Sequence, residues 1–161
     1  MTETDERLTF EDLIVGQTWR PGRATFTEDG ILAFAREFDP QPFHVDSEAG
    51  KRHFDGLIAS GWHTAAACMR PFATEVLSEV AIVAALGIDN LRWHRPVEPG
   101  DVLDVEVTVA EKEPWDDTRG KVTFELTATN QDGERTHSRN DLVLVERDLS
   151  VEHSSEQEQK N

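Results

Sequence analysis

Three segments in the second half of the chain alternate apolar and polar residues, and this alternation constrains the fold more than any other feature. They run from Leu103 to Val109, from Val122 to Ala128 and from about Thr136 to Val145. A period of two residues is typical of a strand with one buried face. The segment from Asn130 to Gly133 is typical of a hairpin turn. Three such strands in series predict an antiparallel meander.

The first half of the chain predicts helices instead of long strands. Thr27 is a candidate N-cap for a helix that must end before Pro40. The apolar residues of this helix recur at helical spacing and predict one buried face: Ile31, Leu32, Ala35 and Phe38. A strand is expected before it, from Arg23 to Phe26, and a short helix capped by Asp46 or Ser47 is expected after it.

A longer helix is expected to begin at Gly61, because an alanine-rich apolar segment from Ala65 to Met69 follows it. Pro71 predicts a kink or a restart within this apolar segment. Between this apolar segment and the meander, we expect a strand only from Leu91 to Trp93. Helices followed by a meander, with one alanine-rich helix to enclose, predict the α+β class.

The length of 161 residues predicts one domain, which we assign to residues 1–147. Residues 148–161 form an acidic and polar tail that has too little apolar surface to order itself, so we expect it to be disordered. The single cysteine, Cys68, is expected in the core and fits a reducing cytoplasm. No apolar run is long enough to span a membrane, and no targeting segment is visible.

The chain has 32 acidic and 16 basic residues, and its formal net charge is −16. A surface with this charge repels nucleic acids and anionic membranes, so neither is an expected partner. Two interpretations of the charge remain open. It can serve solubility alone, or it can be a halophilic adaptation, since molar salt screens the repulsion between carboxylates.

The candidate chemistry lies around Asp39 and His44, which are five residues apart in a segment that Pro40 and Pro42 keep out of a helix. A carboxyl and an imidazole are the groups that general acid–base catalysis uses most often. Gly61 would add backbone N–H groups at the positive end of a helix. By spacing alone, Asp39 could equally cap a turn while His44 lies on the surface.

Metal binding is an alternative use of the same residue types. The pairs His44 with Asp46 and His53 with Asp55 contain imidazole and carboxylate ligands that suit several divalent ions. Their spacing matches no metal signature, so we expect no metal site.

The Asp39 and His44 pair, Gly61 and the segment from Arg92 to Asp101 together resemble the MaoC-like dehydratase family. This family has the hot-dog fold and includes the (R)-specific enoyl-CoA hydratases. The resemblance extends from about Phe10 to about Arg147. The family's hydratase signature usually reads Gly-Asp-x-Asn-Pro, where this chain has Phe-Asp-Pro-Gln-Pro, and its usual His-Gly pair is Ser60-Gly61 here.

The resemblance implies a single hot-dog domain, in which an antiparallel sheet wraps around a central long helix. It also implies a lyase of fatty acid metabolism that reversibly hydrates a 2-enoyl-CoA to an (R)-3-hydroxyacyl-CoA. In that reading Asp39 and His44 transfer protons, and the Gly61 amide binds the oxyanion. The substrate-binding residues would be Pro42, Phe43, Ser60 and Trp62.

Further expectations follow from the same resemblance. The substrate would be a thioester of coenzyme A or of an acyl carrier, with no metal or redox cofactor, and the protein would be a cytoplasmic homodimer. The candidates for binding coenzyme A phosphates are Lys51, Arg52, Arg92 and Arg95. Two other functions stay open: a hot-dog acyl-CoA thioesterase and a non-catalytic acyl-binding module.

We expect the protein to be more stable in molar salt than in dilute buffer. A net charge of −16 repels itself, and salt screens that repulsion. The check is the melting temperature between low and molar KCl, which should rise; a flat or falling value would contradict this electrostatic argument.

Overall fold

The computed structural model describes residues 6–150, so the expected disordered tail lies almost entirely outside the described residues. Its strands are β1 (Thr18–Thr25), β2 (Ile82–Trp93), β3 (Val102–Pro114), β4 (Arg119–Thr129) and β5 (Arg135–Glu146). Its helices are α1 (Glu28–Phe38), α2 (Pro42–Val45), α3 (Ser47–Gly50), α4 (Gly61–Glu75) and the 3₁₀ turn η1 (Leu77–Glu79). No helix within residues 6–150 combines the length and apolarity needed to cross a bilayer.

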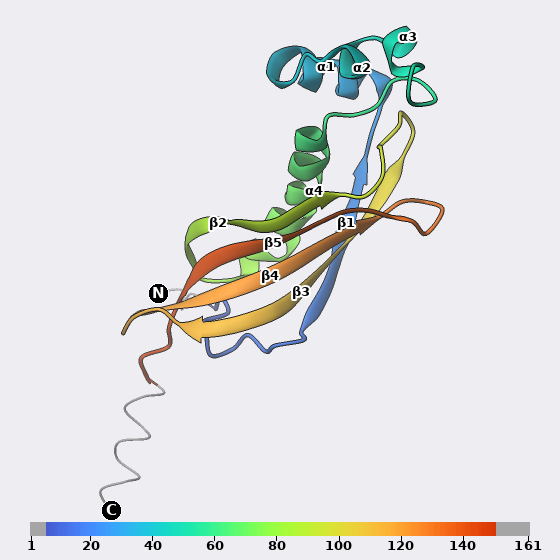
Figure 1. The fold of residues 1–161 in the computed structure, drawn as a ribbon. Coiled ribbons are helices and arrows are strands. Elements are labelled where there is room, and N and C mark those ends of the chain that lie inside the picture. Colours follow the sequence, from blue (N-terminus) through green and yellow to red (C-terminus); the bar gives the residue numbers. More distant parts are fainter. Residues whose placement is uncertain (1–5, 151–161) are drawn as a thin grey trace, which may run out of the picture.

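The five strands form one antiparallel sheet in the order β1-β3-β4-β5-β2. The predicted meander is confirmed, since β3, β4 and β5 are neighbours in chain order. The hairpin between β4 and β5 is held by Asn130, whose side-chain oxygen accepts hydrogen bonds from the backbone N–H groups of Asp132 and Glu134, each at 3.0 Å. Figure 1 shows the sheet curving around α4, with α1, α2 and α3 gathered at one end.

Helix α4 packs against this sheet and supplies one side of the core. The Phe72 ring meets the Phe124 ring of β4 edge-on, with 5.5 Å between the centroids. Cys68 is fully buried beside them, and this burial raises the pKa of its thiol to about 12, which confirms a core cysteine. The expected restart at Pro71 was wrong, because the helix continues through this proline to Glu75.

Strand β2 is the element that sequence reasoning largely missed. Only its last residues, from Leu91, were expected to be a strand, whereas it begins at Ile82. It is an edge strand that pairs with β5 alone, and none of its residues is fully buried. With no buried face, its sequence carries no period-two alternation, and that removes the signal used for the other strands.

Helix α1 begins and ends as predicted, with the Thr27 hydroxyl accepting a hydrogen bond from the Gly30 amide. Its buried face is narrower than expected, because Ile31 and Ala35 are buried but Phe38 is 66% exposed. The expectation that two prolines keep His44 out of a helix was also wrong. Pro42 instead starts the one-turn helix α2, since the first helical position needs no backbone donor.

A row of polar side chains is buried between β5 and α4. The Arg139 guanidinium donates hydrogen bonds to the Asp141 carboxylate at 2.9 Å and to the Ala65 carbonyl in α4 at 2.7 Å. Burial raises the pKa of Asp141, while the neighbouring Arg139 opposes that rise. His137 on the same strand is fully buried, and burial followed by the charge of Arg139 lowers its pKa to about 4.

We expect Arg139→Leu to lower the free energy of unfolding by about 3–5 kcal/mol, because it leaves Asp141 buried without its partner. The double variant Arg139→Leu/Asp141→Leu should recover much of this loss, since no lone charge then remains in the core. Denaturant unfolding of Arg139→Leu, Asp141→Leu and the double variant measures the coupling free energy between the two side chains. Additive losses would contradict a buried ion pair.

Candidate active site

Asp39 and His44 face each other between the end of α1 and helix α2. The His44 Nε2 atom lies 3.4 Å from the Asp39 Oδ2 atom, and the two side chains are 7% and 17% exposed. This distance is long for a direct hydrogen bond but suits two groups that contact one water molecule. The structure therefore brings together the two side chains that the sequence singled out.

The hydrogen bond on the other side of the imidazole fixes its tautomer. His44 Nδ1 lies 2.8 Å from the carbonyl oxygen of Ile58. A carbonyl oxygen can only accept, so Nδ1 carries the hydrogen and the neutral ring presents its lone pair at Nε2. The nitrogen that faces Asp39 is thus available as a base.

The Asp39 carboxylate has two further partners. The Ser60 hydroxyl donates to Oδ2 at 2.6 Å, and the Gln41 side-chain amide donates to Oδ1 at 2.7 Å. These two hydrogen bonds, the Ser60 one first, lower the pKa of Asp39 below its usual value; burial opposes them with a smaller effect, and a protonated His44 would add to the lowering. The carboxyl is therefore held in its charged form.

The segment from Leu57 to Ser60 is held in place by backbone hydrogen bonds to two other parts of the fold. The Ile58 amide donates to the Phe43 carbonyl of α2 at 3.2 Å, and the Ala59 amide donates to the Val97 carbonyl at 2.8 Å. All four residues of the segment are buried. This anchoring fixes the positions of the Ile58 carbonyl, which orients His44, and of the Ser60 hydroxyl, which contacts Asp39.

Ser60 joins the acid to the start of the long helix. It is fully buried and is the N-cap of α4, where its oxygen accepts a hydrogen bond from the Trp62 amide at 3.3 Å. Gly61, the next residue, is the first of the helix, as predicted. Among residues 6–150 no hydrogen bond is made by the Gly61 amide, which lies at the positive end of the helix.

A tryptophan that sequence reasoning did not select covers Gly61. A Cβ atom added at Gly61 would lie 2.4 Å from the Trp93 indole, so this position accepts only glycine while Trp93 stays in place. The Trp62 ring meets Trp93 edge-on, with centroids 5.4 Å apart, and both are about half exposed. The helix start is thus flanked by two aromatic side chains at the surface.

The other predicted substrate-binding residues lie around the same centre. Phe43 contacts the His44 ring edge-on at 4.5 Å between centroids, and Pro42 is exposed at the first position of α2. Ser60 has its hydroxyl on Asp39 and is buried, which makes it part of the support of the acid. Gln41 and Trp93 were not selected as site residues, although Gln41 lies within the quoted signature.

The residues considered for metal binding do not converge. Asp46 caps α3 by accepting a hydrogen bond from the Glu48 amide at 2.9 Å, and His53 is exposed. Within residues 6–150, no group of three or more histidine, cysteine or acidic side chains is arranged to hold a metal ion.

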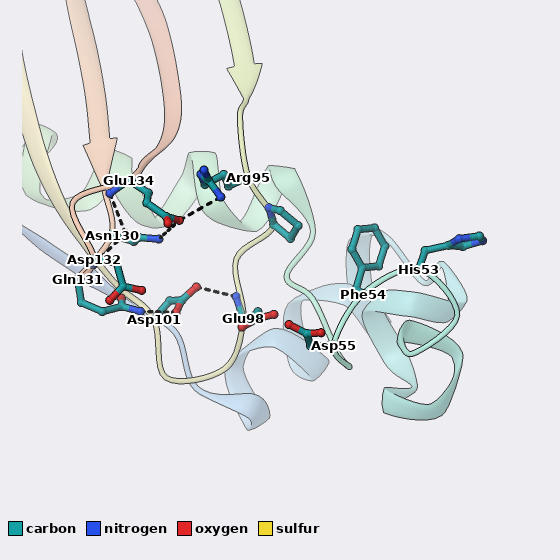
Figure 2. Close-up of a pocket in the computed structure, with 11 residues that line it drawn as sticks. His53, Phe54, Asp55, Arg95, Glu98, Asp101, Asn130, Gln131, Asp132 and Glu134 are labelled. Atoms are coloured by element: carbon teal, nitrogen blue, oxygen red, sulfur yellow. Dashed lines mark hydrogen bonds and ion pairs between the residues drawn. The ribbon is translucent and has the colours of Figure 1, made fainter.

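A polar hollow of about 470 Å³ lies between the segment after α3, the Arg95–Asp101 turn and the β4–β5 hairpin. Figure 2 shows Arg95 paired with Glu134, and Asp101 accepting hydrogen bonds from Gln131 and the Glu98 amide. Acidic side chains outnumber basic ones among those lining it. Arg95, a candidate for binding phosphate, is already paired here, as Lys51 is with Glu48.

Comparison with known proteins identifies relatives of this chain. The sequence model of the MaoC-like domain matches residues 13–131. The uncharacterized protein YdeM of Bacillus subtilis is 33% identical over 138 residues, which cover 85% of this chain and 98% of YdeM.

Two solved structures share the fold. The MaoC-like dehydratase from Rhodospirillum rubrum is 43% identical, with a TM-score of 0.79, over 88% of this chain and 98% of that one. The unliganded R-hydratase PhaJ1 from Pseudomonas aeruginosa is 28% identical, with a TM-score of 0.72, over 88% of each chain. The expected hot-dog arrangement of a sheet around a central helix is confirmed. The chain belongs to the MaoC-like dehydratase family.

Proposed function

We propose that this protein reversibly hydrates a 2-enoyl thioester to an (R)-3-hydroxyacyl thioester, with Asp39 and His44 as the catalytic pair. The observation that carries the proposal is the geometry of the pair: two hydrogen-bond acceptors, Nε2 and Oδ2, are 3.4 Å apart and largely shielded from solvent. A water molecule between them would donate one hydrogen to each and present its oxygen to the substrate.

The reaction requires that this water lose a proton while its oxygen bonds to C3 of the enoyl group. The electrons of the double bond then move onto the thioester oxygen, and C2 finally accepts a proton. Positioned acids and bases contribute about 10²–10⁴ to such proton transfers. The pair supplies these transfers with water as the only other reactant.

The thioester oxygen gains negative charge between the two proton transfers, and the Gly61 amide is suited to bind it. Ser60 places the amide close to the pair, because it is bonded covalently to Gly61 and its hydroxyl contacts Asp39. A single preorganised donor of this kind contributes about 10²–10³. Trp62, Trp93 and Phe43 would line the approach of the acyl group.

This chemistry uses a thioester of coenzyme A or of an acyl carrier as substrate and needs no metal or redox cofactor. We propose one domain over residues 1–147 and place its reaction in the cytoplasm. Arg52 and Arg92 are both exposed, and within residues 6–150 Arg92 donates a hydrogen bond only to the neighbouring Leu91 carbonyl, so they are the better candidates for binding phosphate.

We propose that the protein is a homodimer joined along strand β2. This edge strand pairs with β5 on one side only, and Val83, Leu86 and Ile88 are each 42–48% exposed on it. An unpaired edge with exposed apolar side chains is suited to pairing with another strand. A second copy would cover the apolar groove of about 590 Å³ that β2 forms with α4 and β5.

We expect Asp39→Asn and His44→Asn each to lower kcat by at least ~10², because each removes one of the two groups that act on the water. The double variant should be hardly slower than either single one, since the two groups act on one water. The measurement is the absorbance loss of crotonyl-, hexenoyl- and branched enoyl-CoA, with free thiol followed in parallel to detect thioesterase activity.

A matched control is available in the segment after α3. His53→Asn and Asp55→Asn change the same residue types at exposed positions and should leave kcat unchanged. If Asp39 only capped its turn, Asp39→Asn would cost ~0.5–2 kcal/mol of stability and keep full activity, and that result would overturn the proposal.

We expect Leu86→Glu/Ile88→Lys to shift the protein from dimer to monomer, because charged side chains on an edge strand oppose pairing with another strand. Sedimentation velocity over a range of concentrations measures this. The surface variant Ile14→Glu changes an exposed apolar residue away from β2 and should leave the dimer intact. A monomeric wild-type protein would contradict the proposed interface.

A further inference from the structure

The Asp39 carboxylate accepts one neutral hydrogen bond on each oxygen, from two different parts of the chain. Ser60 donates to Oδ2 at 2.6 Å, and Gln41 donates to Oδ1 at 2.7 Å. These donors are two of the three positions at which this chain differs from the usual family signature, the third being Phe38. Both differences therefore meet at the same catalytic group.

We propose that Ser60 and Gln41 are positioning residues that hold Asp39 as a fixed anion, so that His44 alone carries the proton during the reaction. The inference rests on the proposed hydratase function for its chemical part. Its structural part, the support of the carboxylate by two donors, stands on the geometry alone.

The orientation of His44 agrees with this division of roles. Its Nδ1 hydrogen is engaged by the Ile58 carbonyl, so Nε2 is the atom that can take up a proton beside Asp39. The water oxygen bonds to C3, and one water proton moves to Nε2. The resulting imidazolium is stabilised by the Asp39 anion 3.4 Å away and returns the proton to C2, which leaves His44 neutral.

Protonation of Asp39 would disturb both supporting contacts. A carboxylate offers acceptor sites on both oxygens, whereas a protonated carboxyl must turn one oxygen into a donor. The Ser60 hydroxyl and the Gln41 amide each donate to a carboxylate oxygen, and hydrogen bonds to a charged carboxylate are stronger than those to a neutral carboxyl. Both donors therefore lower the pKa of Asp39, and His44 on α2 is the titratable group that faces it.

Ser60 has a second role as the N-cap of α4, so its removal alone cannot separate support of Asp39 from support of the helix. Gln41 allows that separation. Its side chain is exposed and makes no capping hydrogen bond in α2, and its amide contacts Asp39. Gln41→Met removes the donor while keeping the length of the side chain.

The first experiment is the titration of Asp39 by carboxyl ¹³C NMR in the wild type, Gln41→Met, Ser60→Ala and the double variant. Hydrogen bonds donated to a carboxylate favour its charged form, so each single variant should raise the Asp39 pKa. The double variant should raise it further. An unchanged Asp39 pKa in Gln41→Met would overturn the supporting role.

The second experiment is the pH dependence of kcat/KM with an enoyl-CoA. The ratio of variant to wild type should fall as the pH is lowered from 8 to 5 in each single variant, because a growing fraction of Asp39 becomes protonated. A ratio that is the same at every pH would indicate a merely structural role and would overturn the assignment.

The exposed variant Glu48→Gln serves as the control, since it removes a charge near α2 without touching Asp39, and its ratio should stay flat. The two experiments test different parts of the proposal and can give different outcomes. If the wild type hydrated no enoyl thioester, the proposed function and the proton path would be overturned, while the NMR titration would still decide whether Ser60 and Gln41 hold the anion.

Discussion

The enclosure of α4 by the curved sheet is the constraint on which the rest of the structure depends. Packing of Phe72 and Cys68 against β4 fixes the axis of the helix, and its first residue, Gly61, is thereby placed near the Asp39 and His44 pair. The N-terminus of a buried helix has backbone donors that lack partners within the helix. In this fold the same packing that stabilises the core also directs such a donor toward the site.

The site itself is assembled from segments that pack at one end of the sheet. Asp39 follows α1, His44 lies in α2, and Ser60 is the N-cap of α4. The buried segment before α4 connects them, because its carbonyl at Ile58 orients the imidazole and its hydroxyl at Ser60 supports the carboxylate. A single segment thus sets the tautomer of His44 and supports the charge of Asp39.

The residues that differ from the family pattern acquire a physical meaning only in three dimensions. In the sequence, Gln41 and Ser60 are nineteen positions apart and give no sign of a shared contact. In the structure, each donates to a different oxygen of Asp39. The change from a histidine to a serine before Gly61 keeps a polar group at that position while bringing a short donor into the support of the acid.

The sequence by itself determined the meander, the two main helices and the pairing of Asp39 with His44, because a period of two, helix caps and prolines are local signals. The tertiary structure decided the extent of β2, the helical start at Pro42 and the position of Trp93 on Gly61. These features depend on residues distant in the chain. An edge strand without a buried face lacks the alternation that marks the other strands, and the sequence around Gly61 does not indicate that the Trp93 indole packs on it.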